Sequence, residues 1–126
     1  MRKAIPRESG AGKLSEDQIQ IAVVDHLKKR GDPNSIWWHT PNGGGRSARE
    51  GAKFKAMGLL PGVSDLILHN SAGEAFALEL KRDGGRPTES QMLFLSRWRD
   101  RPHHHGVVSE GLDEALAILK SWNLIR

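Results

Sequence analysis

An aspartate, a glutamate and a lysine near the middle of the chain have types and spacing suited to metal-assisted chemistry. Asp65 is followed by thirteen residues and then by Glu79-Leu80-Lys81. Two carboxylates held close together repel each other, and a hard divalent cation bound between them removes the repulsion. A neighbouring ammonium group can orient a water molecule or stabilise charge that develops on a phosphate. These residues therefore indicate hydrolysis of a phosphate ester, provided that the fold brings them together.

A β-hairpin would bring them together. Residues 63–69 are apolar and β-prone, residues 70–73 are typical of a turn, and residues 75–81 resume a strand. If the hairpin is centred near Ala72, Asp65 lies opposite Glu79, with Cβ atoms about 5 Å apart. Side chains alternate along a strand, so Lys81 points to the same face as Glu79. We expect Glu79 and Lys81 to serve the chemistry and to lie outside the core.

The spacing alone leaves a plainer interpretation open, in which Asp65 begins a strand and Glu79-Leu80-Lys81 is a solvated strand end. The flanking residues favour the catalytic interpretation. They are Gly62-Val63-Ser64-Asp65 before the hairpin, and Asp83-Gly84-Gly85-Arg86 and Thr88-Glu89-Ser90-Gln91 after it.

Together these segments resemble the core of a VRR-NUC-type nuclease of the PD-(D/E)XK, or restriction-endonuclease-like, superfamily. The resemblance covers about residues 14 to 125. His39-Thr40-Pro41-Asn42-Gly43-Gly44 followed by Arg46 also resembles the loop before the second helix in phage-type members. The chain departs from the family pattern at Ser64, where proline is common. The neighbouring Asp65, which matches the metal ligand of the family, is present.

The resemblance implies a Mg²⁺- or Mn²⁺-dependent DNA endonuclease that hydrolyses phosphodiester bonds. Asp65 and Glu79 would bind the metal, and the backbone carbonyl of Leu80 would be a further ligand. Glu16, which matches the acidic residue on a preceding helix of the family, would add a ligand directly or through water. Without the resemblance, Glu16 reads as a first-turn carboxylate that the helix dipole favours.

The resemblance also assigns roles to a lysine and a glutamine. Lys81 would position the attacking water and stabilise the developing negative charge. Gln91 would support the site or the substrate. The alternative for Gln91 is a capping role alone, because Thr88 and Gln91 have the spacing of a capping box.

The charge of the chain favours a polyanionic partner, since its formal net charge is +4. A domain of this size has little surface for reading bases, so we expect recognition of DNA shape and backbone, as in junctions, flaps or nicks. A homodimer would supply two sites for opposite strands. Two alternatives are a non-catalytic nucleic-acid-binding module on a nuclease scaffold and a basic structural protein. The expected DNA contacts are Arg46, Arg49, Lys53, Arg82 and Arg86.

Several other functions are excluded by what the sequence lacks. It contains no cysteine, which excludes disulfides and thiolate metal sites. The glycine-rich segment 41–45 lacks the Gly-Lys-Ser/Thr ending of a phosphate-binding loop, so we expect no nucleotide cofactor. No apolar run approaches the ~20 residues of a membrane span, and no signal peptide is recognisable. We therefore expect a cytoplasmic protein, in a prokaryotic or phage-infected cell. Consecutive histidines rarely converge on one ion, so we expect 103–105 to be an exposed loop.

The elements that must position these residues alternate between helices and strands. We predict a flexible basic arm over 1–13 and a single nuclease domain over 14–126. Helices are predicted at 15–30, 47–57, 88–100 and 111–121, and strands at 35–40, 63–69, 75–81 and 106–109. This order predicts an α/β fold with a mixed four-stranded sheet flanked by helices. The resemblance implies a restriction-endonuclease-like α-β-β-β-α-β core, with the helix after the first strand as an insertion.

The apolar residues predict which faces are buried. The first helix has an apolar stripe at Ile19, Ala22, Val23 and Leu27, and the third has one at Leu93, Leu95, Trp98 and, less clearly, Phe94. Two adjacent tryptophans in a strand cannot both face the core. One of Trp37 and Trp38 is therefore expected to be partly exposed.

Overall fold

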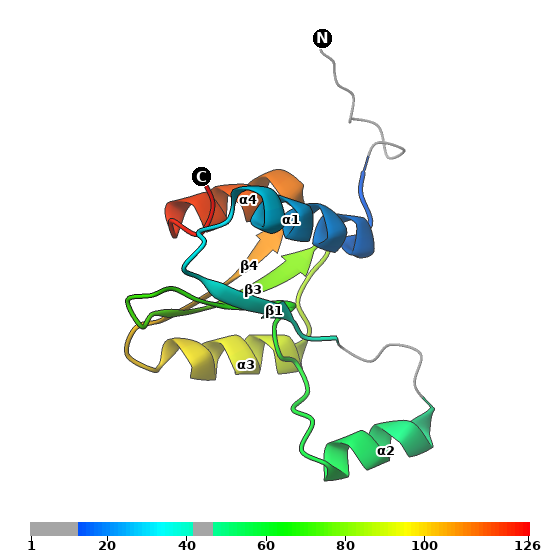
Figure 1. Ribbon diagram of the computed structural model, residues 1–126. Helices are drawn as coiled ribbons and strands as arrows, with labels where there is room; N and C mark the ends of the chain where they lie inside the picture. Colours follow the sequence, from blue (N-terminus) through cyan, green and yellow to red (C-terminus); the bar gives the residue numbers. More distant parts are fainter. Residues whose placement is uncertain (1–12, 42–46) are drawn as a thin grey trace. The chain divides into compact units, whose positions relative to one another are not determined.

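The computed structural model describes residues 13–41 and 47–126 (Figure 1). The predicted arm, apart from Lys13, and residues 42–46 lie outside the described residues. The helices are α1 (Glu16–Arg30), α2 (Ala48–Ala56), α3 (Glu89–Arg99) and α4 (Leu112–Ser121). The strands are β1 (Ile36–His39), β2 (Leu66–His69), β3 (Ala75–Lys81) and β4 (His104–Glu110). The element order is the one that the sequence predicted.

The four strands form one sheet in the order β1-β2-β3-β4. β1 pairs with β2, and β2 with β3, in the antiparallel sense. The amide of Ala75 donates to the carbonyl of His103, at the start of both strands. The amide of Gly111 donates to the carbonyl of Lys81, at the end of both strands. β4 therefore runs parallel to β3. The mixed four-stranded sheet and the α/β class are therefore confirmed.

Side-chain caps define the starts of three helices. α1, α2 and α3 each begin with a complete capping box, in which Ser15, Ser47 and Thr88 accept from the backbone three residues on. The return bonds come from side chains at the third helical position, which satisfy backbone amides that would otherwise lack partners. These caps fix where Glu16 and Gln91 sit, in the first turns of α1 and α3.

The described residues divide into two compact units that both contain part of β3 and β4. The first contains 13–35, Leu80–Arg86 and Val108–Arg126, and the second contains Ile36–Glu79 and Pro87–Val107.

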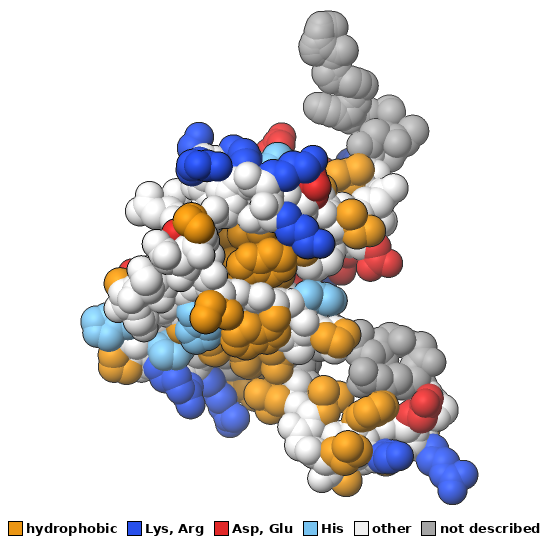
Figure 2. Space-filling model, viewed as in Figure 1, with side chains coloured by type: hydrophobic (Ala, Val, Ile, Leu, Met, Phe, Trp, Pro, Cys, Tyr) orange, Lys and Arg blue, Asp and Glu red, His pale blue; other side chains and the backbone are white. Residues whose placement is uncertain are grey.

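In the first unit α1 lies beside α4 (Figure 1). The C-terminal segment returns to the end of α1, where Gly31 and Ile125 form an isolated bridge. Lys and Arg side chains gather over α1 (Figure 2), among them the three basic residues of its last turn. The core of the unit consists of Ile19, Val23, Leu27, Leu80, Ala115, Leu119, Leu124 and Ile125.

The second unit is built on the hairpin of β2 and β3, whose strands are almost wholly buried. α3 packs closely against β4, because a Cβ added to Gly106 would lie 2.9 Å from Leu95 and 3.1 Å from Trp98. α2 belongs to the same unit but contains no buried residue. It presents both hydrophobic and basic side chains to solvent (Figure 2).

Four expectations need correction. β2 begins at Leu66, because the preceding residues form a turn at Gly62, where φ is +83°. The strand predicted at 106 begins at His104, so the histidine run is only partly a loop. Leu93 is 54% exposed, and the buried residue of α3 is Leu95. Glu79 and Lys81 were both expected outside the core, but Glu79 is only 1% exposed and Lys81 only 8%.

Candidate functional site

Asp65 and Glu79 lie at the open end of the hairpin of the second unit. The strand register pairs Leu66 with Leu78 and Ile67 with Ala77, which centres the hairpin on Ala72. Extended by one residue beyond β2, the same register would set Asp65 opposite Glu79. Residues opposed in an antiparallel pair have Cβ atoms about 5 Å apart. The hairpin therefore leaves Asp65 directly before β2 and Glu79 near the end of the neighbouring β3.

The backbone at Asp65 is held by β1. Its carbonyl accepts a hydrogen bond of 2.9 Å from the amide of Thr40 and one of 2.8 Å from Nδ1 of His39. Because a carbonyl can only accept, Nδ1 of His39 is the protonated ring nitrogen. The sequence did not single out His39 for this role, since a pairing between distant strands leaves no local signal.

The turn before Asp65 is held against α3. Gly62 has a positive φ of +83°, and a Cβ added there would lie 2.2 Å from the carbonyl oxygen of Ser90. Only glycine allows this close approach. Ser64 is 1% exposed. Ser64 is therefore part of the packed turn.

Glu79 and Lys81 are two residues apart on β3, so their side chains emerge on the same face of the strand. Both are buried, whereas an ordinary strand end would be solvated. In the first unit Nζ of Lys81 lies 3.9 Å from Oε1 of Glu16. Glu16 is the half-exposed partner, with 43% of its side chain accessible, and Lys81 is the buried one at 10%.

Two glutamines have different surroundings. Gln91 caps α3, because its Oε1 accepts from the amide of Thr88 at 2.8 Å. Gln20 lies one turn after Glu16 on α1, with both amide atoms of its side chain buried and without a hydrogen-bond partner in the described residues. A buried amide without partners is costly, so a bound water molecule or ligand group would be expected to satisfy it.

The expected DNA contacts are exposed where the structure describes them. Arg49 and Lys53 are exposed on α2, and Arg82 and Arg86 are exposed after β3. Arg46 lies outside the described residues.

One member of the histidine run, His105, belongs to a hydrogen-bond network around Glu74. Nε2 of His105 lies 2.9 Å from Oε2 of Glu74, and the Nδ2 of Asn70 donates to Oε1 of Glu74 at 2.9 Å. The pKa of Glu74 is lowered below its usual value of 4.5. The hydrogen bond from Asn70 is the largest cause, and the hydrogen bond from His105 is the next. His103 is exposed.

The donor set of the hairpin fits a hard divalent cation. Across 13–41 and 47–126, no group of three or more His, Cys, Asp or Glu side chains is arranged to hold a metal ion. Mg²⁺ needs fewer protein ligands than that, since one or two carboxylates suffice and water or phosphate oxygens complete its shell. The pair of Asp65 and Glu79 meets this requirement.

No helix in the described part of the chain is long and apolar enough to cross a membrane.

Comparisons with known proteins identify the fold. No protein-family model matches the chain, and no curated protein does. A solved structure named "VRR_NUC domain protein" has a TM-score of 0.69 at 24% identity, over 86% of this chain and 88% of that one. A second, named "VRR_NUC domain", has a TM-score of 0.56 at 18% identity, over 85% of this chain and 96% of that one. The chain therefore has a VRR-NUC-type, restriction-endonuclease-like fold, as the resemblance implied.

Proposed function

We propose that this chain is a Mg²⁺- or Mn²⁺-dependent DNA endonuclease that hydrolyses phosphodiester bonds. The observation that carries the proposal is the register of β2 and β3, because one residue beyond β2 it would set Asp65 opposite Glu79, with Lys81 two residues further on the same strand face. The VRR-NUC-type fold supports it, because this arrangement lies in the hairpin where the resemblance implies the catalytic residues.

The metal would be held by the carboxylates of Asp65 and Glu79 and by the backbone carbonyl of Leu80. Glu16 would contribute directly or through a water molecule. When bound, a divalent cation supplies Lewis-acid stabilisation of phosphate oxygens and a water that is activated at neutral pH. The hydrogen bonds from Thr40 and His39 to the Asp65 carbonyl keep the backbone of this ligand in place without engaging its carboxylate.

Lys81 would orient the attacking water and stabilise the negative charge that develops on the phosphate. Lys81 is only 8% exposed, which limits the directions that its ammonium group can take. Its Nζ lies 3.9 Å from Oε1 of Glu16. Gln91 would support the site from the first turn of α3, where its capping bond already fixes one end of its amide.

The DNA would be recognised by its backbone and shape. Arg46, Arg49, Lys53, Arg82 and Arg86 would contact phosphates, which position a protein on DNA without reading sequence. We propose branched, flapped or nicked DNA as the preferred substrate, and a homodimer that offers one site to each strand.

A panel assay tests the proposed function. The purified chain is incubated with labelled blunt duplex, nicked duplex, flap and four-way junction DNA, in Mg²⁺, in Mn²⁺ and in EDTA. Cleavage is expected with either cation and none in EDTA, with faster cleavage of the branched or nicked forms. Lack of cleavage of every form in both cations would contradict the proposal, and sedimentation of the same sample reports the oligomeric state.

A further inference from the structure

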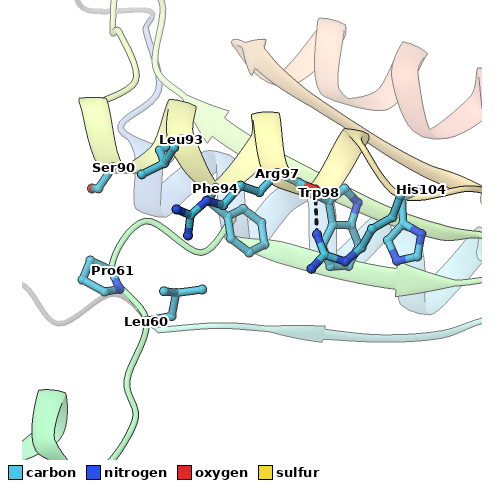
Figure 3. A pocket seen from close by; sticks show the side chains of 9 residues that line it. Leu60, Pro61, Ser90, Leu93, Phe94, Arg97, Trp98 and His104 are labelled. Atoms are coloured by element: carbon cyan, nitrogen blue, oxygen red, sulfur yellow. Dashed lines mark hydrogen bonds between the residues drawn. The ribbon is translucent and has the colours of Figure 1, made fainter.

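A cavity of about 480 Å³ opens beside α3, within the second unit. Phe94 and Trp98 of the helix form one wall, and Leu60 and Pro61 face them from the segment after α2 (Figure 3). Binding sites for small organic groups have volumes of about 300–1,000 Å³ and mostly apolar linings. The cavity therefore has the size and the lining of a ligand site, and none of the residues proposed for catalysis lines it.

The aromatic wall is held rigid. The rings of Phe94 and Trp98 are stacked, with centroids 5.5 Å apart and planes 29° apart. The indole Nε1 of Trp98 donates to the carbonyl of His105 at 2.9 Å, and His104 meets the indole edge-on at 4.7 Å. Since these contacts already fix the rings, a flat ligand could stack there without ordering the wall first.

Two arginines border the same cavity. Arg97 lies in the last turn of α3 and Arg101 just beyond its end, and Nη1 of Arg101 donates to the backbone carbonyl of Arg97 at 2.7 Å. Both side chains are exposed. In the described part of the chain neither guanidinium forms an ion pair with a carboxylate. Their charge is therefore available to an anionic ligand, and guanidinium groups suit phosphate.

We propose that this cavity binds an unpaired nucleotide of a DNA strand. The base would enter between the Phe94–Trp98 wall and the Leu60–Pro61 wall, and the phosphates on either side of it would contact Arg97 and Arg101. Aromatic stacking with basic contacts is how proteins bind single-stranded nucleic acid. A paired base cannot enter, because its neighbours in the duplex cover its faces. The ligand must therefore come from a flap, a single-stranded tail or an unpaired junction base.

This inference rests on the proposed nuclease function, and narrows its substrate to DNA that has a single-stranded segment. The cavity would then act as an anchor for that segment. Selectivity for branched DNA would come from base stacking in the cavity as well as from the shape of the duplex.

Binding in EDTA tests the inference without requiring cleavage. Fluorescence anisotropy compares a labelled blunt duplex with the same duplex carrying a short oligo-dT tail. The wild-type protein is expected to bind the tailed DNA roughly five- to a hundredfold more tightly, which is the factor that one stacked base contributes. Phe94→Leu keeps an apolar side chain but removes the stacking face, and Arg97→Gln removes one cation. Either variant should bring the ratio of the two affinities close to one.

Met92→Ala and Lys28→Gln are the matched controls. Met92 is exposed on α3 but does not line the cavity, and Lys28 is an exposed cation on α1. Neither change should alter the ratio. Circular dichroism verifies that each variant is folded, and Arg97→Gln changes a surface residue, so at least one variant remains informative.

Three results would overturn the inference. The first is equal affinity of the wild-type protein for both DNAs. The second is a preference for the tailed DNA that survives both Phe94→Leu and Arg97→Gln. The third is a dimer that Phe94→Leu dissociates, which would assign the cavity to a second copy of the chain. Failure of the proposed catalysis gives a different pattern, with the tail preference retained in EDTA and no cleavage in Mg²⁺ or Mn²⁺.

Discussion

The ammonium group of Lys81 lies 3.9 Å from the carboxylate of Glu16, although one residue is on β3 and the other begins α1. The capping box at Ser15 fixes the first turn of α1, and with it the position of Glu16. Glu16 is half-exposed, so solvent screens this contact and limits its contribution to stability. Its interest is chemical, because Glu16 can influence a lysine that is proposed to act on the attacking water.

Glu16→Gln should lower the cleavage rate by orders of magnitude and shift the Mg²⁺ dependence to higher concentration. A first-turn carboxylate with no other role is worth only about 0.3–1 kcal/mol of stability. Asp17→Asn is the matched control, because Asp17 is an acidic residue of the same first turn. Single-turnover cleavage measured against Mg²⁺ concentration compares the two variants. Equal effects on the rate would reduce Glu16 to a helix-dipole role.

Glu79→Gln and Lys81→Met should each abolish metal-dependent cleavage. These changes preserve side-chain size, which matters because both residues are buried. Substitution by alanine would add the cost of a cavity to the loss of function. Calorimetric titration of Mn²⁺ should separate the two roles, with weaker binding for Glu79→Gln and unchanged binding for Lys81→Met. Wild-type-like nicking by either folded variant would remove that residue from the proposed site.

Gly62→Ala should destabilise the fold and lower the activity. Gly73→Ala should destabilise the fold but leave the activity unchanged. Both glycines have positive φ, so alanine at either costs about 1–2 kcal/mol. At Gly62 the new Cβ also collides with the backbone of Ser90, whereas at Gly73 nothing lies within 4 Å. The turn that leads to Asp65 must then shift, and a 1 Å displacement can cost about a hundredfold in rate. Denaturant unfolding and cleavage assays on both variants measure the difference, and equal costs would mean that the turn tolerates the collision.

Glu74 should make stability dependent on pH in acid. Its pKa is lowered in the folded protein, so its contribution is fully present above its usual value of 4.5 and is lost as the pH falls through the folded value. Glu74→Gln should therefore be less stable than wild type at neutral pH, and the difference should vanish in acid. Denaturant unfolding at the two pH values measures this. The exposed Glu89→Gln controls for the loss of one negative charge, and a difference that grows in acid would reverse the assignment.

DNA binding should weaken steeply with salt, because each neutralised phosphate adds about 0.9 to the log–log slope on duplex DNA. Changing Arg49, Lys53, Arg82 or Arg86 to glutamine should reduce the slope by about that amount for each phosphate that is no longer neutralised. Anisotropy titrations on blunt duplex over a range of salt concentrations give the slopes. A salt dependence that is flat for the wild-type chain would exclude phosphate binding as the basis of affinity.

The sequence predicted local features well. The capping box at Thr88 was recognisable because its partner, Gln91, is three residues away. The hairpin centre at Ala72 was recognisable because a turn separates two β-prone runs. One of two adjacent tryptophans was expected to be exposed, and Trp38 is, at 45%.

What the sequence did not predict depends on packing between distant segments. The burial of Glu79 follows from the position of β3 between β2 and β4, and no local pattern reports a strand's neighbours. The exposure of Leu93 has a similar cause, since an apolar residue that lines an open cavity has the same local pattern as one in the core. The cavity does have a signal in the sequence. Phe94 and Trp98 are spaced by four residues, which aligns two aromatic side chains along one side of a helix, with Arg97 beside them.

The hairpin between Asp65 and Glu79 also bears on how related chains could be found by pattern search. The thirteen-residue interval is a property of strand length, because the pairing of β2 with β3 determines which residues meet, and the exposed tip at 71–73 is remote from both carboxylates. A homologue with one more residue pair in the ladder would need an interval of fifteen and would keep the same juxtaposition. A query with a fixed gap would discard it, whereas one that lets the gap grow in steps of two would retain it.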